Sequence, residues 1–277
     1  MVIIDELRRR YKDFSLDGIL ILSKLLNVDK SHIYTYGEKE VSKEVENKFI
    51  YLMEKRTKGY PIQYILKERE FMGLEFYLED GVLVPRPDTE ILVEYVIDYI
   101  NRRYKGINIK ALDIGIGSGA ISLSVANYCK DVEVYGIDIE DIPIKVANIN
   151  KEKFNLTNVS FYKGDLFQAL EGLDLKFHII MSNPPYIASE KIEGLHTTVK
   201  DFEPRVALDG GVDGLDFYRR ITVESKKYLK DNGLLIYEIG FDQGEEVYNI
   251  LVKEGFSNVS ILKDLQGLDR VVLGIKK

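Results

Sequence analysis

The chain has 277 residues, 45% of them hydrophobic and 30% charged, so it can bury a sizeable core beneath a polar surface. This composition excludes a disordered or fibrous protein and favours one large or two unequal domains. The formal net charge of -7 opposes a polyanion, so we expect no stable complex with nucleic acid.

Signals for a cellular location are few. Residues 1–12 have neither the apolar stretch nor the cleavage site of a signal peptide, and no apolar run approaches the roughly 18 residues that span a bilayer. The single cysteine, Cys129, can form no internal disulfide, and we expect it to pack in a core. We therefore predict a cytoplasmic protein with no membrane partner, and the spacing of His and Cys predicts no metal site.

Residues 1–59 carry apolar side chains at helical spacing, which predicts a small helical domain. From residue 60 the pattern changes to short apolar runs separated by Pro61, Gly73 and Gly81. Such runs are typical of extended segments, so we expect residues 60–84 to form a hairpin linker. The expected extended segments are Gln63–Leu66, Glu70–Tyr77 and Gly81–Val84.

Residues 85–277 alternate between strand-like and helix-like patterns, beginning with a helix for which Asp88 or Thr89 is the expected cap. Repeated strand–helix units predict a mostly parallel sheet with helices on both faces. The expected strands are Ile109–Ile114, Val132–Ile137, Val159–Tyr162, Phe177–Met181, Leu234–Ile239, Val259–Leu262 and Arg270–Ile275. Expected helices include Pro143–Phe154, Leu215–Leu229 and Gln243–Glu254.

A glycine-rich loop follows the first of these strands, with the sequence Gly115-Ile116-Gly117-Ser118-Gly119. Glycines there allow a tight turn and let a nucleotide-like cofactor approach the backbone and the helix N-terminus. Asp138 ends the next strand and is placed to accept hydrogen bonds from both ribose hydroxyls. With Ala120 the loop also fits the relaxed dinucleotide pattern, so a dehydrogenase using NAD is an alternative on this loop alone.

Two further acidic residues flank this predicted cofactor site. Asp113, just before the glycine loop, either caps the turn or faces the charged amino group of the cofactor. Asp165, followed by Leu166, either accepts a hydrogen bond from an adenine amine or caps the next helix. The matching glycine loop favours the cofactor interpretation for Asp165 and leaves both open for Asp113.

The acceptor segment, Asn183-Pro184-Pro185-Tyr186, follows a buried strand, and its two prolines fix the backbone and remove N–H groups. The side-chain oxygen of Asn183 and the carbonyl of Pro184 can then accept both hydrogens of a planar NH2 group. Tyr186 can stack on the same planar group. The pattern indicates transfer to an amino nitrogen, and a hydride-transfer enzyme has no evident need for it.

Four further motifs are Pro61–Ile65, Gly81–Glu90, Glu203–Leu208 and Gly210–Asp216. The second and the fourth are more specific than the glycine loop or the acceptor segment. Together with the glycine loop and residues 183–187, the four motifs resemble the release factor glutamine methyltransferase family (HemK/PrmC type) over almost the whole chain. Asp88 stands where the family often has Glu, which keeps the charge.

The resemblance implies a class I, Rossmann-like methyltransferase fold with a seven-stranded sheet, preceded by a helical domain that helps hold the protein substrate. It implies transfer of the S-adenosylmethionine methyl group to the side-chain nitrogen of the glutamine in the Gly-Gly-Gln motif of class I peptide chain release factors. S-adenosylhomocysteine is then the product, and we expect a monomer.

Site residues follow by position in the motifs. We expect the cofactor to bind Asp113, Gly115, Ile116, Gly117, Ser118, Gly119, Asp138, Asp165, Leu166 and Asn183. We expect the substrate to bind Asn183, Pro184, Pro185, Tyr186, Arg86 and Arg205, with Asn183, Pro184 and Tyr186 acting in catalysis. For the two arginines, salt-bridged anchors of their loops are the alternative.

Two other functions are weighed against this one. An N(6)-adenine methyltransferase acting on DNA or RNA would use the same acceptor segment for an extruded base, although a long basic recognition region is missing. A non-catalytic cofactor-binding protein is disfavoured because the acceptor segment and the cofactor loop are both intact.

Overall fold

The computed structural model describes residues 2–277, which divide into two compact units. The first unit comprises the residues up to Glu68 together with His196–Phe202, and the second comprises Arg69–Leu195 and Glu203–Lys277. Each unit has its own apolar core.

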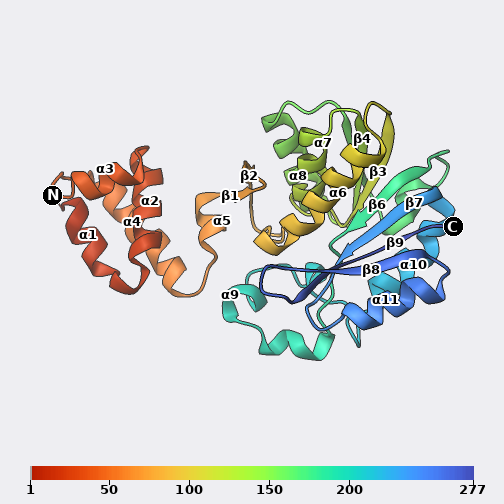
Figure 1. The fold of residues 1–277 in the computed structure, drawn as a ribbon. Coiled ribbons are helices and arrows are strands. Elements are labelled where there is room, and N and C mark those ends of the chain that lie inside the picture. The colour runs from red at the N-terminus through yellow and green to blue at the C-terminus, as the bar shows by residue number, and fades with distance from the viewer. Residues whose placement is uncertain (1) are drawn as a thin grey trace. The chain divides into compact units, whose positions relative to one another are not determined.

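The first unit is helical, as the apolar spacing predicts. Its helices are α1 (Ile4–Arg10), α2 (Ser15–Leu26), α3 (Lys30–Thr35), α4 (Lys43–Thr57), α5 (Ile62–Leu66) and α9 (Thr197–Lys200), with a 3-10 turn, η1, at Lys12–Phe14 (Figure 1). Leu7, Leu22, Phe49 and Met53 are fully buried in its core. The hydroxyl of Ser42 accepts the backbone N–H of Val45 and so caps α4.

The linker differs from the prediction at both ends. Gln63–Leu66 is part of helix α5 and not an extended segment, because Ile62, Ile65 and Leu66 pack at helical spacing onto the core of the first unit. A hairpin does follow, formed by β1 (Glu68–Phe71) and β2 (Leu74–Tyr77). Residues 81–84, also expected to be extended, have an irregular backbone outside both strands.

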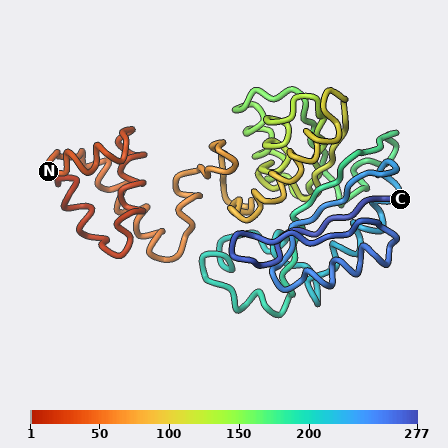
Figure 2. Tube along the Cα trace, viewed as in Figure 1, coloured from red at the N-terminus to blue at the C-terminus, as the bar shows by residue number. Residues whose placement is uncertain are grey.

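The second unit contains a seven-stranded sheet in the order β5-β4-β3-β6-β7-β9-β8, which confirms the predicted fold. Its strands are β3 (Ile109–Ile114), β4 (Val132–Asp138), β5 (Val159–Lys163), β6 (Phe177–Ser182), β7 (Leu229–Glu238), β8 (Ser257–Lys263) and β9 (Asp269–Ile275). The strands from β3 to β7 pair in parallel, whereas β9 runs antiparallel to both β7 and β8. Figure 2 shows these last two strands side by side in dark blue.

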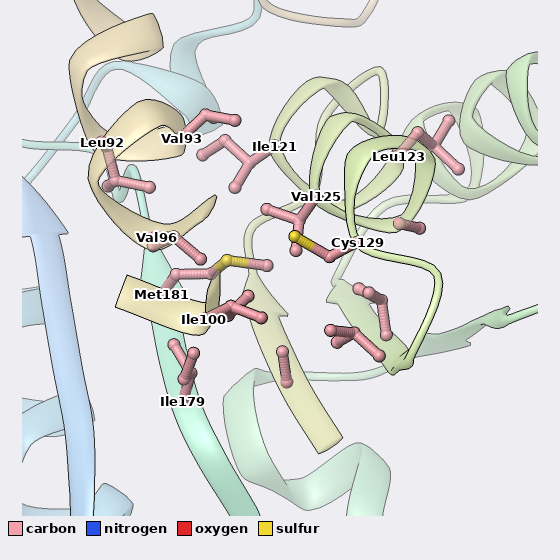
Figure 3. Close-up of a cluster of buried hydrophobic side chains, with 14 of the residues drawn as sticks. Leu92, Val93, Val96, Ile100, Ile121, Leu123, Val125, Cys129, Ile179 and Met181 are labelled. Carbon is pink, nitrogen blue, oxygen red and sulfur yellow. The ribbon is translucent and has the colours of Figure 1, made fainter. Parts of the chain in front are cut away.

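Helices cover both faces of this sheet. They are α6 (Glu90–Arg103), α7 (Ala120–Tyr128), α8 (Asp141–Lys153), α10 (Asp216–Tyr228) and α11 (Gly244–Lys253), with 3-10 turns η2 (Pro87–Thr89), η3 (Leu166–Leu170), η4 (Ser189–Gly194) and η5 (Arg205–Ala207). On one face α6 and α7 pack against β3 and β6, and Figure 3 shows Cys129 in this cluster, buried as predicted. On the other face α10 and α11 pack against β6, β7 and β9. Within residues 2–277, no helix combines the length and apolar character needed to cross a membrane.

Candidate functional site

A cavity of about 270 Å³ lies at the carboxyl edge of β3, β4 and β6, where parallel strands of such sheets present their loops. Ile114, Asp138 and Ser182 bring the ends of the three strands to its wall. Predicted site residues among its lining are Arg86, Gly115, Ile116, Gly117, Ser118, Asp138, Asp165, Leu166, Asn183, Pro184 and Pro185. The fold thus brings the predicted cofactor loop and the acceptor segment, distant in sequence, to one space.

The glycine loop has a backbone that other residues rarely adopt. Gly115, Gly117 and Gly119 have φ angles of 78°, 54° and 81°, all in the left-handed region. A Cβ on Gly119 would lie 2.9 Å from Leu123 Cδ1, so this glycine also allows α7 to start tightly against its neighbours. A Cβ on Gly115 would meet no atom within 4 Å, which leaves the backbone open to a ligand.

Asp138 holds the glycine loop in place from the end of β4. Its Oδ2 accepts the backbone N–H of Gly117 at 3.1 Å, and its Oδ1 accepts the N–H of Glu140 at 3.1 Å. Burial raises the pKa of the Asp138 carboxyl, while these N–H groups oppose the rise. Each oxygen has lone pairs beyond these bonds, so the carboxylate can also accept ribose hydroxyls.

Asp113 lies behind the glycine loop and is not among the residues that line the cavity. Its Oδ2 accepts both the backbone N–H, at 3.1 Å, and the hydroxyl of Ser122, in the first turn of α7. These are the contacts of the capping interpretation, since helix N-termini leave N–H groups without partners. Full burial raises the pKa of Asp113 to about 7.

Asp165 does line the cavity, next to Leu166. Its Oδ2 accepts Arg220 Nη2 at 2.7 Å, and its side chain makes no capping bond to η3. Leu166 has a φ of 47°, a strained conformation for a residue with a Cβ, and such strain is often found at functional sites. In the part of the chain described here, no three His, Cys, Asp or Glu side chains are grouped as a metal site would require.

The acceptor segment leaves β6 with three of its four residues on the cavity wall, Asn183, Pro184 and Pro185. Asn183 Nδ2 donates to Thr89 Oγ1 at 3.3 Å, so the Asn183 amide is held at one end. Tyr186 is not part of the lining. Its ring packs against the core on the α10 side, and its carbonyl accepts Gln243 Nε2 at 2.9 Å.

A loop from Glu203 to Gly214 holds the acceptor segment from behind. The N–H of Ile187 donates to the carbonyl of Leu208 at 3.0 Å, and Gly210 N–H donates to the carbonyl of Ile187 at 2.8 Å. A Cβ on Gly210 would lie 2.8 Å from both the Pro185 carbonyl oxygen and Tyr186 Cα. Gly210 therefore lets two backbones approach closely.

The two predicted arginines lie in different surroundings. Arg86 lines the cavity and pairs with Glu203, whose Oε1 lies 2.6 Å from Arg86 Nη2. Arg205 lies outside the lining and pairs with Asp209 at 3.2 Å, on its own loop. Both pairs are the contacts expected of loop anchors, and the Arg86 pair has one almost fully buried partner.

Four residues of the site were not predicted from the sequence. They are Thr89 as a partner of Asn183, Glu203, Glu238 and Gln243. Glu238 carried a usable signal, because an acidic residue interrupts an otherwise apolar strand. Thr89 was expected as a helix cap; it occupies the N-cap position of α6, but its side chain makes no capping bond.

Comparison with known proteins agrees with this geometry. The methyltransferase domain family matches residues 106–251, so the chain is a methyltransferase. The seven-stranded, mostly parallel sheet and the cavity at its carboxyl edge agree with this class of enzyme. The PrmC N-terminal domain family matches residues 3–66.

The release factor glutamine methyltransferase of Clostridium acetobutylicum is 47% identical over 94% of this chain and 90% of the relative. That of Thermodesulfovibrio yellowstonii is 36% identical over 99% of this chain and 98% of the relative. The chain belongs to the release factor glutamine methyltransferase family.

A solved structure supports the fold alone. The 16S rRNA N2 G1207 methyltransferase of T. thermophilus, solved with AdoMet and guanosine, has a TM-score of 0.55. It is 18% identical, and the likeness covers 76% of this chain and 50% of that one. The adenine-methylating alternative is not favoured, since the full-length relatives carry the name of a glutamine methyltransferase.

Proposed function

We propose that this enzyme transfers the methyl group of S-adenosylmethionine to the side-chain amide nitrogen of the glutamine in the Gly-Gly-Gln motif of class I peptide chain release factors. The observation that carries the proposal is the shared cavity, in which the glycine loop and Asn183–Pro184 line one space. Relatives that share 47% and 36% of their residues with this chain, and are named for this activity, support the choice of substrate.

The residues present fit S-adenosylmethionine. The open backbone at Gly115 would face the amino acid end of the cofactor, and the Asp138 carboxylate would accept the ribose hydroxyls. Asp165 and Leu166 would hold the adenine at the end of β5. When bound, the cofactor supplies an electrophilic methyl on a sulfonium, and it leaves as S-adenosylhomocysteine.

The protein's task is to aim a weak nucleophile. The Asn183 side-chain oxygen and the Pro184 carbonyl would accept the two amide hydrogens of the substrate glutamine, with Tyr186 supporting the segment. Transfer of the methyl group from sulfur to the amide nitrogen would leave a protonated amide, which would give its extra proton to solvent as the methylated product leaves the cavity. Alignment and exclusion of water then account for the acceleration, without a strong base.

The other parts of the proposal concern context. We propose that residues 1–59 form a substrate-recognition domain, that residues 60–84 link it to a methyltransferase domain at 85–277, and that the enzyme acts as a cytoplasmic monomer with no stable nucleic acid bound. Arg86 and Arg205 are proposed to contact the release factor, in addition to their ion pairs.

The test is methyl transfer from labelled S-adenosylmethionine to a purified class I release factor, with mass spectrometry to locate the label. The controls are the same factor with its Gly-Gly-Gln glutamine replaced, and an adenine-containing DNA. Label on that single glutamine is the expected result. Label on DNA and none on the factor would assign the enzyme to the adenine alternative.

A further inference from the structure

Two strand ends place Glu238 beside the acceptor segment. In the parallel pair β6–β7, Ser182 is in register with Tyr237, so Asn183, the first residue after β6, lies beside Glu238, the last residue of β7. Thr89, at the start of α6, contacts both side chains. Three elements therefore meet at the cavity wall, where Thr89 and Asn183 belong to the lining and Glu238 does not.

Among these three side chains, Asn183 acts as a donor and Glu238 acts as an acceptor. Asn183 Nδ2 donates to Thr89 Oγ1 at 3.3 Å. Both side chains lie beside the Glu238 carboxylate, where as donors they lower its pKa. Glu238 is only 1% exposed, and among residues 2–277 its Oε2 has no hydrogen-bond partner. A buried carboxylate so incompletely satisfied is costly for folding, which indicates a role in function.

The cation nearest Glu238, Arg270, forms its ion pairs with other carboxylates through Nη2, while its Nε has no hydrogen-bond partner among residues 2–277. Arg270 on β9 pairs with Asp264 at 3.0 Å and with Asp88 at 3.2 Å. The hydroxyl of Tyr218 on α10 donates to the backbone carbonyl of Glu238, not to its carboxylate. Thr89 and Asn183 are therefore the neutral donors placed beside the carboxylate itself.

We infer that Glu238 is a positioning residue that sets the orientation of the Asn183 amide, directly and through Thr89. A carboxylate only accepts hydrogen bonds, so the NH2 end of Asn183 must face Glu238 and Thr89. The Asn183 oxygen is then turned toward the cavity, where an acceptor is needed for the substrate amide. The inference rests on the proposed function for its catalytic consequence, but the orientation itself does not depend on it.

The ionisation of Glu238 would control this orientation. A protonated carboxyl can donate, which would favour the turned amide, in which the Asn183 oxygen faces Glu238 and not the substrate. Burial raises the pKa of Glu238 to about 7; hydrogen bonds from Thr89 and Asn183 and the charge of Arg270 oppose the rise, and Asp88 adds to it. Tyr186 and Tyr218, the other titratable groups beside it, stay neutral because burial raises their pKa values.

The first test observes Asn183 without any substrate. In ¹⁵N-labelled protein, the Asn183 side-chain NH2 signal is identified by its loss in Asn183→Ala. We expect its shift to titrate near pH 7 in the wild type and to lose that titration in Glu238→Gln. An Asn183 signal with the same pH profile in both proteins would overturn the inference.

The second test measures catalysis. The loss of a hydrogen bond to a charged group predicts that Glu238→Gln lowers kcat by roughly 10- to 100-fold. The KM for S-adenosylmethionine should change far less. Thr89→Val should lower kcat similarly, and Thr89→Ser, which keeps the hydroxyl, should recover most of that loss. Glu238→Gln with wild-type kcat and pH profile would contradict the inference.

The two tests separate the two proposals. A wild-type enzyme that leaves the release factor unmethylated, while its Asn183 signal still titrates with Glu238, would refute the proposed function and support the positioning role. An active wild type together with an equally active Glu238→Gln variant would support the proposed function and refute the positioning role. Thermal melts of each variant check that the fold is retained.

Discussion

The Cα position of Gly210 faces the Pro185 carbonyl so closely that a Cβ on Gly210 would lie 2.8 Å from that oxygen. The same Cβ would lie 2.8 Å from Tyr186 Cα, so backbone blocks it on two sides. Neither atom can move without shifting the acceptor segment, which makes this glycine part of how Asn183 and Pro184 are aimed.

Gly210→Ala is therefore expected to displace the acceptor segment. Overpacking of this kind costs about 1 to 3 kcal/mol of stability, and misplacement of Asn183 should lower kcat by more than it lowers affinity for the cofactor. The matched control is Gly194→Ala, at the end of η4 in the same connection between β6 and α10, where a Cβ meets no atom within 4 Å. Chemical denaturation and steady-state kinetics measure both effects. Equal behaviour of the two variants would show that the close approach has no importance.

Asn183→Ala should abolish one of the two aimed hydrogen bonds to the substrate amide. We expect a loss of roughly 2 to 4 kcal/mol of transition-state stabilisation, read as a fall in kcat/KM for the release factor. Calorimetric affinity for S-adenosylmethionine should fall much less, because the glycine loop and Asp138 are untouched. Asn183→Asp keeps an acceptor but adds a charge that attracts the sulfonium, so its cofactor affinity should not fall below that of the alanine variant. A near-normal kcat/KM for Asn183→Ala would refute its assignment as an acceptor.

Arg86→Ala should destabilise the fold more at high pH than at low pH. It leaves Glu203 buried without its cation, and burial already raises the pKa of Glu203 against the effect of Arg86. Without Arg86 that pKa rises further, so the cost, about 1 to 3 kcal/mol, is present at pH 8 and shrinks near pH 5 as Glu203 takes up a proton.

Arg205→Ala provides the control for Arg86→Ala, because Arg205 pairs on the exposed surface with Asp209. Its stability should change by less than about 1 kcal/mol at either pH. Urea unfolding at the two pH values distinguishes the variants. A pH-independent loss for Arg86→Ala would mean that Glu203 does not carry the unpaired charge.

Glu238→Gln is expected to be more stable than the wild type above neutral pH. The folded-state pKa of Glu238 is raised to about 7, so the folded protein holds this proton more tightly than the unfolded chain does. Stability therefore falls as pH rises from the ordinary glutamate range through 7, by on the order of 3 kcal/mol for this group. The neutral variant escapes that loss, and its advantage should vanish near pH 4. Melting temperatures across this range measure it. A wild type as stable as the variant at pH 8 would refute the assigned burial cost.

The periodicity of the sequence was sufficient for the sheet but not for the linker. Strand β3 begins at Ile109 and ends at Ile114 as predicted, because a short, mostly apolar run that leads into a glycine loop is typical of a strand in a parallel sheet. The run Gln63–Leu66 is equally short and apolar, yet it is helical. Four residues are too few to distinguish the two periods, and packing in the core of the first unit decided the outcome.

Motifs located the cavity, whereas the supporting contacts lay beyond local sequence. The glycine loop and residues 183–186 could be found because glycines and prolines constrain their own backbone. Glu203 could not be connected to Arg86, since 117 positions separate them and only the tertiary fold brings them together. The orientation of Asn183 likewise depends on Thr89 and Glu238, which neither spacing nor composition links to it.

Residues 196–202 belong to the helical unit although they lie far from its other residues in the sequence. This separation decides when the unit can complete its packing. Phe202 packs edge-on against Tyr60 at a ring distance of 5.4 Å, so one piece of the unit's packing is encoded far downstream of the rest. On the ribosome, helices α1 to α5 emerge long before this segment, and they must wait for most of the sheet to be synthesised. A truncated chain that stops after the hairpin would lack this piece permanently, so an isolated N-terminal fragment would expose the Tyr60 face that Phe202 otherwise covers.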